Sequence, residues 1–158
     1  MSDGSIILSL TAIRVSDLTR SVEFYTRGCG FVVERKFTTP SFTAVIIRGG
    51  SAGLELILPA DGTVPGPSDH GTMLRKFVLN TDDPAAVMSR ACALGGTVIT
   101  EAKEYTEYGM TIGLIADPDG YKLEFVGRPV STSGKAEKTG ATTEHEARTL
   151  VGTRSASE

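Results

Sequence analysis

The stretch Asp-Pro-Asp-Gly-Tyr-Lys-Leu-Glu-Phe at residues 117–125 predicts a tight turn followed directly by a strand. Pro118 presets φ for a turn position, and Gly120 supplies a backbone conformation that a Cβ atom disfavours. Side chains alternate between the two faces of a strand, so the apolar neighbours of Glu124 point one way and its carboxylate the other. We therefore expect Glu124 to lie on the face of its sheet opposite to the core.

A second stretch repeats this arrangement 69 residues earlier. Residues 53–58, Gly-Leu-Glu-Leu-Ile-Leu, again place one acid, Glu55, between leucines. The order of elements before each acid also repeats: a strand at 6–15 or 73–80, a helix that begins near Asp17 or Asp83, and two further strands. The helix starts are 66 residues apart. Similar offsets between matching elements indicate an internal duplication.

The duplication predicts an α+β fold made of two β-α-β-β-β modules that form curved mixed sheets. The modules occupy about residues 6–58 and 73–128, within one domain of residues 1–128. Residues 59–72 carry prolines and glycines with little hydrophobicity, which is typical of a linker. Residues 129–158 contain no aromatic residue and few large aliphatic ones, so we expect a disordered polar tail.

The composition is that of one soluble globular domain, with 40% hydrophobic and 22% charged residues in 158. The net charge of −3 gives no electrostatic case for binding nucleic acid. No apolar run reaches the roughly 20 residues of a membrane span, and the start of the chain does not resemble a secretory signal. We therefore expect a cytoplasmic protein. Cys29 and Cys92 could pair, but two thiols in such a chain are more often reduced.

Two motifs resemble those of the vicinal oxygen chelate superfamily, which includes glyoxalase I, bleomycin-resistance proteins and extradiol dioxygenases. The segment Ile-Arg-Val-Ser-Asp-Leu at residues 13–18, followed by Ser-Val-Glu-Phe-Tyr at 21–25, resembles the opening of these proteins. Residues 117–124 resemble the closing motif of glyoxalase I in particular. The resemblance covers about residues 6–128 and implies the duplicated fold, although one fold hosts many chemistries.

The resemblance also implies where a metal would bind. In the metal-dependent members four strand positions converge on one divalent ion, and these positions fall at Leu10, Glu55, Lys76 and Glu124. Leu10 has no lone pair, and a protonated Lys76 repels a cation and accepts no bond. We therefore expect no cofactor: Glu55 and Glu124 could hold a divalent metal weakly, but Leu10 and Lys76 disfavour it.

The residues favour a metal-independent lyase or isomerase that acts on a small carbonyl- or oxygen-rich substrate. Glu124 is the expected general base and Lys76 the group that stabilises an enolate, with Glu55 and Leu10 lining the substrate site. Lys76 could equally form a structural ion pair with either acid. The alternative is a non-catalytic protein that sequesters a small molecule, as in the bleomycin-resistance branch, and the third is a divergent metal-dependent lactoylglutathione lyase. Exposed sheet edges in both modules predict a homodimer.

Overall fold

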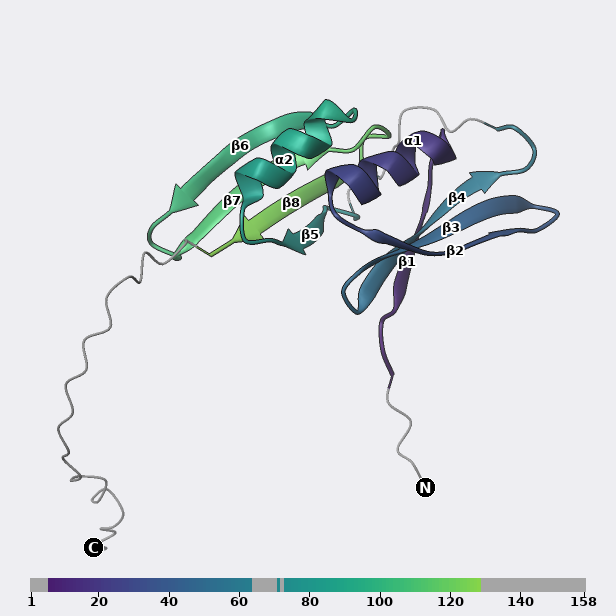
Figure 1. Ribbon diagram of the computed structural model, residues 1–158, viewed down its shortest axis with the longest axis horizontal. Coiled ribbons are helices and arrows are strands. Elements are labelled where there is room, and N and C mark those ends of the chain that lie inside the picture. Colours follow the sequence, from purple (N-terminus) through teal and green to yellow (C-terminus); the bar gives the residue numbers. More distant parts are fainter. Residues whose placement is uncertain (1–5, 64–70, 72, 129–158) are drawn as a thin grey trace, which may run out of the picture.

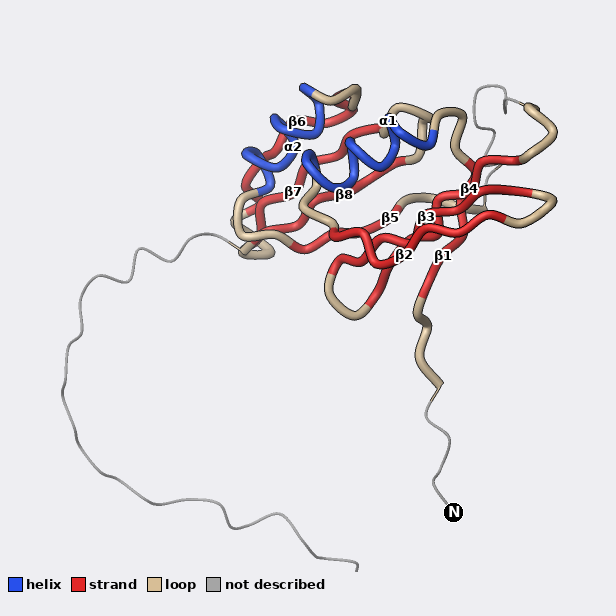
Figure 2. Tube along the Cα trace, turned by 45° about the vertical axis from the view of Figure 1, so that its right-hand side comes forward, coloured by secondary structure: helices blue, strands red, loops and turns tan. Residues whose placement is uncertain are grey.

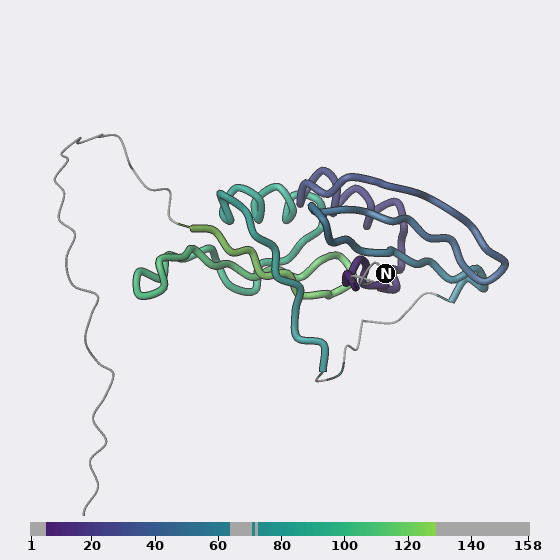
Figure 3. Tube along the Cα trace, turned by 90° about the horizontal axis from the view of Figure 1, so that it is seen from below, coloured from purple at the N-terminus to yellow at the C-terminus, as the bar shows by residue number. Residues whose placement is uncertain are grey.

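The computed structural model describes residues 6–63, 71 and 73–128, which form two modules that lie next to each other (Figures 1 and 3). The expected tail at 129–158, most of the expected linker and the two histidines lie outside the described residues. The first module contains β1 (Leu10–Arg14), α1 (Leu18–Glu23), the π-helical segment η1 (Phe24–Gly28), β2 (Val32–Thr38), β3 (Phe42–Gly49) and β4 (Ala52–Pro59).

The second module repeats this order. It contains β5 (Phe77–Asn80), α2 (Pro84–Ala93), β6 (Thr97–Tyr105), β7 (Met110–Ala116) and β8 (Lys122–Gly127). The strands form two four-stranded sheets, in the orders β1-β4-β3-β2 and β5-β8-β7-β6. The first strand of each module runs parallel to the last, and the other pairs are antiparallel. The predicted α+β fold of two curved mixed sheets is confirmed.

Both helices begin where the sequence predicted. The Asp17 carboxylate accepts from the backbone N–H of Arg20 at 2.9 Å, and the Asp83 carboxylate accepts from that of Ala86 at 2.9 Å. Each carboxylate thereby satisfies a backbone donor that has no partner inside its helix. No helix in the described part of the chain is both long and apolar enough to cross a bilayer.

The first strand of each module is shorter than predicted. The strand expected at 6–15 starts at Leu10, and the strand expected at 73–80 starts at Phe77. Both starts are set by the parallel partner, because β4 begins at Ala52 and β8 begins only at Lys122, directly after the turn. Residues that precede those starts have no strand beside them to bond, whatever their own β propensity.

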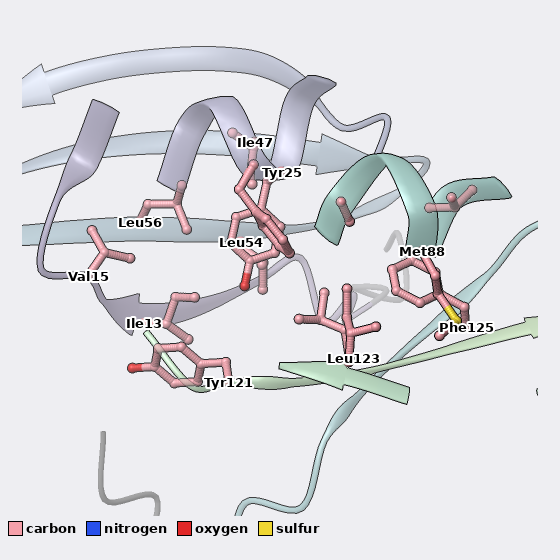
Figure 4. Packing of buried hydrophobic residues seen from close by; sticks show 14 of the residues in the cluster. Ile13, Val15, Tyr25, Ile47, Leu54, Leu56, Met88, Tyr121, Leu123 and Phe125 are labelled. Carbon is pink, nitrogen blue, oxygen red and sulfur yellow. The ribbon is translucent and has the colours of Figure 1, made fainter. Parts of the chain in front are cut away.

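The core is one cluster that both modules share. Figure 4 shows Leu54 and Leu56 of β4 in the same cluster as Leu123 and Phe125 of β8, and all four are buried. The helices are neighbours (Figure 2), with η1 packed against α2. Their approach requires a glycine, because a Cβ atom at Gly28 would lie 2.9 Å from the Cα of Ala91.

The turn at 117–120 connects the modules through a buried carboxylate. Asp117 is 4% exposed and accepts hydrogen bonds from the Tyr25 hydroxyl at 2.7 Å and from the backbone N–H groups of Asp119 and Tyr121 at 2.9 and 2.8 Å. Burial raises the pKa of Asp117, and these three hydrogen bonds oppose the increase. Burial, followed by the charge of Asp117, raises the pKa of Tyr25 well above 10, so the phenol keeps the proton that it donates.

The same turn also holds the start of α1. The Asp119 carboxylate accepts from the backbone N–H of Ser16 at 3.2 Å, from the Ser16 hydroxyl, and from Arg20 Nη2 at 3.1 Å. Tyr121, the residue after the turn, contacts the end of β1: its hydroxyl donates to the backbone carbonyl of Arg14 at 3.0 Å. The turn that leads into β8 of the second module therefore also holds the end of β1 and the start of α1 in the first module.

We predict that Tyr25→Phe lowers the free energy of unfolding by about 1–3 kcal/mol, because it removes a donor from a buried carboxylate while keeping the aromatic ring. In the parent, the hydrogen bond from Tyr25 stabilises the ionised form of Asp117. Its removal therefore raises the pKa of folded Asp117 further. The destabilisation should therefore grow as the pH rises through the raised pKa of Asp117 in the parent and be complete above its still higher pKa in the variant. Urea titrations between acidic and neutral pH measure both quantities.

The matched control is Tyr121→Phe, which removes a phenol that donates to a neutral carbonyl. Its destabilisation should be nearly the same at acidic and neutral pH, because its acceptor does not titrate. A pH-independent loss for Tyr25→Phe as well would contradict the charged character assigned to the Tyr25–Asp117 bond.

Candidate functional site

Both acids lie on the face of their sheet that the helix does not cover. Leu54 and Leu56 are buried on either side of the half-buried Glu55. Leu123 and Phe125 flank Glu124 in the same way, and the side chain of Glu124 is 19% exposed. Because both acids are on strands that are packed and paired, the backbone position of each carboxylate side chain is held by a rigid element.

Lys76 and Glu124 form an ion pair, with the ammonium donating to the carboxylate. Lys76 directly precedes β5, which runs parallel to β8 with Phe77 opposite Leu123. This register places Lys76 and Glu124 on the same face of the second sheet. The Lys76 side chain is 39% exposed, so solvent screens the pair and its contribution to stability is small. Its significance is chemical: a cation and a base lie side by side.

Two apolar side chains lie beside Glu124 in this pair. Val78 lies beside Glu124 on β5 and Leu114 lies beside it on β7, so the three side chains form one row across the sheet. Val78 is 56% exposed on β5, which is an edge strand of the second sheet. A substrate that covers this row would remove apolar surface from water and desolvate the ion pair in the same step.

Glu55 differs from Glu124 because it makes no hydrogen bond or ion pair with any residue that the structure describes. It lies between Ala12 of β1 and Ile46 of β3, and Ile46 is 7% exposed. Leu10 covers the same face two residues along β1: its Cδ2 would lie 3.1 Å from a Cβ atom at Gly53. The carboxylate therefore emerges from an apolar floor.

The register also places a charged residue, which the sequence analysis did not single out, in line with Glu55. Arg35 of β2 pairs with Ile46, which pairs with Glu55, so Arg35 lies on the same row as that acid. Its guanidinium lies 5.0 Å from the centre of the Phe37 ring, two residues along the strand. The Arg-x-Phe spacing in the sequence indicates the contact between Arg35 and Phe37, but only the strand pairing places Arg35 in line with Glu55.

The structure connects the four positions that the resemblance implied in two pairs. The structure joins Lys76 to Glu124 and places Leu10 near Glu55, but the two acids belong to different sheets. No three His, Cys, Asp or Glu side chains come together as metal ligands in the described ranges. Burial raises the pKa of Cys29 to about 12, so its thiol stays protonated and is a poor nucleophile.

Comparison with known proteins defines the class. The chain belongs to the Glyoxalase/Bleomycin resistance protein/Dioxygenase superfamily, whose family model matches residues 7–125. The expectation from the two motifs is thereby confirmed. A lactoylglutathione lyase of Haemophilus influenzae is 30% identical over 128 residues, which cover 78% of this chain and 94% of that protein.

Solved structures agree on the fold. Glyoxalase I of Zea mays aligns with a TM-score of 0.67 and 26% identity, over 77% of this chain and 44% of the maize chain. The trypanothione-dependent glyoxalase I of Leishmania major aligns with a TM-score of 0.63 and 26% identity, over 78% of this chain and 87% of that chain. This chain therefore spans less than half of the maize enzyme and most of the leishmanial one.

Proposed function

We propose that this protein is a glyoxalase-like lyase or isomerase that acts on a small carbonyl- or oxygen-rich substrate without a resident metal ion. The observation that carries the proposal is the contact between Lys76 and Glu124. At the four positions where metal-dependent members gather ligands, this chain offers two carboxylates, one leucine and one ammonium. Two oxygen donors beside a positive charge do not fit a zinc or nickel site. The relatives named lactoylglutathione lyase support the lyase assignment.

In the proposed reaction, Glu124 removes a proton from a carbon next to a carbonyl group. The pair of electrons left behind moves onto the carbonyl oxygen. Lys76 stabilises that oxyanion by donating a hydrogen bond from its ammonium group. An ammonium has three donors, so Lys76 can keep one on Glu124 and offer another to the substrate. If the deprotonated carbon carries a hydroxyl group, the hydroxyl proton moves to the oxyanion and Glu124 returns its proton to the former carbonyl carbon, which completes an isomerisation. If instead the carbon beyond the deprotonated one carries a leaving group, that group departs with its bonding electrons as the carbonyl re-forms, which completes a lyase reaction.

Glu55 and Leu10 have a binding role in this proposal. A carboxylate without a partner among the described residues can accept a hydrogen bond from a substrate hydroxyl or amide. Leu10 and Ile46 supply the apolar wall beside it. Contacts of this kind orient the carbon–hydrogen bond toward the base, which lowers the entropic part of the barrier.

We predict that Glu124→Gln lowers turnover of a confirmed substrate by about 10²- to 10⁴-fold, the usual contribution of a general base. Ligand affinity should stay within several-fold, because glutamine keeps the shape of the side chain. Lys76→Met should weaken affinity as well as turnover, because the ammonium interacts with both the ground state and the transition state. Steady-state kinetics and calorimetric binding on the same preparations separate the two effects. Unchanged turnover in Glu124→Gln would disprove the catalytic assignment.

The second candidate function is sequestration of a small molecule. It is favoured by the exposed apolar row around Val78, which could hold a ligand without chemistry. A panel of carbonyl and epoxide compounds separates the candidates. Turnover of any member supports the enzyme, whereas tight binding of one compound with no turnover of any of them supports sequestration.

Metal content tests the third candidate, a divergent metal-dependent lactoylglutathione lyase. We expect protein purified without chelators to carry substoichiometric zinc, nickel, cobalt, manganese and iron, and to gain no activity when these ions are added. The reason is that Lys76 already satisfies the Glu124 carboxylate. If the parent carries one equivalent of bound metal, and Glu55→Gln and Glu124→Gln each lose it, the metal-dependent function is established instead.

We propose that the protein acts as a homodimer in the cytoplasm. Two free thiols, Cys29 and Cys92, are consistent with a reducing compartment. Each sheet ends in unpaired edge strands, and apolar side chains are exposed on or near them, among them Val32 at 68%, Ile99 at 47% and Val98 at 40%. A second copy would cover such edges.

Light scattering at tens of micromolar protein, a range in which weak dimers of about micromolar affinity are associated, should give the mass of two chains. The expected value is twice the 16.7 kDa of one chain. A mass of one chain at this concentration would exclude the homodimer.

A further inference from the structure

A groove of about 460 Å³ lies between α1 and the outer strands of the first sheet. Its apolar lining comes from Leu18 and Val22 of α1, Val33 of β2 and Val45 of β3. Val45 and Leu56 are paired on the covered face of the sheet, so the groove opens on the opposite face from Glu55. Its volume is within the roughly 300–1,000 Å³ that is usual for small-molecule sites.

The second module is packed differently at the matching position. There, Met88 of α2 packs so closely over Gly113 of β7 that a Cβ atom at Gly113 would lie 2.2 Å from the sulfur. In the first module the matching residues are Val22 of α1 and Val45 of β3, because Val45 pairs with Leu56 as Gly113 pairs with Phe125, and both valines line the groove. Val33 is 45% exposed although its partner Ile47, on the same helix side of the sheet, is buried.

One charge in the groove has no counterpart in the other module. Lys36 of β2 lines the groove and pairs with Val45, while the matching position beside Gly113 is Ala102, a half-buried apolar residue. Lys36 forms no ion pair with any residue that the structure describes. A lysine can line an apolar wall with its methylene stem and keep its ammonium in water.

The remaining charges at the rim cancel each other. Arg27 donates to the Glu23 carboxylate one turn earlier in the chain, and both residues line the groove. The groove therefore combines an apolar floor with one uncompensated positive charge. The complementary ligand is a molecule with one anionic end and an apolar body.

We propose that this groove binds a linear aliphatic carboxylate, with its chain against Val22, Val33 and Val45 and its carboxylate on Lys36. The methylenes leave water when they cover the exposed Val33 and the half-buried Val22, and each one buried strengthens binding by up to about fourfold. The carboxylate gains a charge-assisted bond from Lys36. The site is separate from the Lys76–Glu124 pair and is independent of the function proposed above.

Titration of the full chain with decanoate, followed by amide NMR shifts and calorimetry, tests the proposal. We expect one saturable site with a dissociation constant below about 1 mM, stronger for decanoate than for octanoate. The shifted amides should belong to α1, β2 and β3. Decan-1-ol, which lacks the charge, should bind several-fold more weakly than decanoate.

Variants of the groove separate its two parts. Lys36→Met should weaken decanoate about 3- to 10-fold and leave decan-1-ol unchanged, because it removes the charge and keeps the stem. Val22→Met copies the residue of the second module and should abolish binding of both. Lys36→Glu, an exposed change with little risk to folding, should abolish decanoate binding alone. The matched control is Lys103→Met on the edge strand β6, which should bind decanoate like the parent.

Three results would overturn the proposal. The first is equal decanoate affinity in the parent and in Lys36→Glu. The second is a set of shifted amides around Glu55 and Glu124 in place of the groove. The third is a change in the mass of the particle by light scattering when Val22→Met is introduced, because the groove would then be a contact between copies of the chain.

Discussion

The buried carboxylate of Asp117 is the constraint on which the arrangement of the two modules depends. A carboxylate withdrawn from water is stable only where donors surround it, and one of its three donors, Tyr25, comes from the other module. The Tyr25 ring is itself fully buried, edge-on against Phe24 and Phe31 at 5.1 and 5.7 Å between ring centres. Packing and hydrogen bonding thus hold the same residue, and the modules cannot separate without exposing both.

This constraint extends to the candidate site through the chain itself. The turn leads directly into β8, so the position of Glu124 follows from that of Asp117, and β5 must start beside β8 for its own hydrogen bonds. Lys76 is the last residue before β5, and it therefore meets Glu124. An ion pair held by two paired strands keeps its geometry better than one between loops, which suits a base and an oxyanion donor that must act on one substrate.

The two modules share a plan and differ in side chains. At matching positions the first module has Leu10 and the second Lys76, so one acid has an apolar neighbour and the other a cation. Val22 and Val45 in place of Met88 and Gly113 are a second difference, and they line a groove on the helix side of the first sheet. The two modules share a backbone plan because each needs its paired strands and its helix cap, whereas the side chains differ on both faces of the sheets.

The sequence by itself determined the elements whose causes are local. Turn residues at 117–120, helix caps at Asp17 and Asp83, and alternation around both acids each depend on a few neighbours along the chain, and the repeat of these signals predicted the fold. Only the tertiary structure decided where β1 and β5 begin, because a strand forms only where a partner strand lies beside it. It also decided which acid pairs with Lys76, because an ion pair forms only between side chains that the fold brings close together. Arg35 joined the row of Glu55 for the same reason: strand register, which no single segment contains, sets which side chains meet.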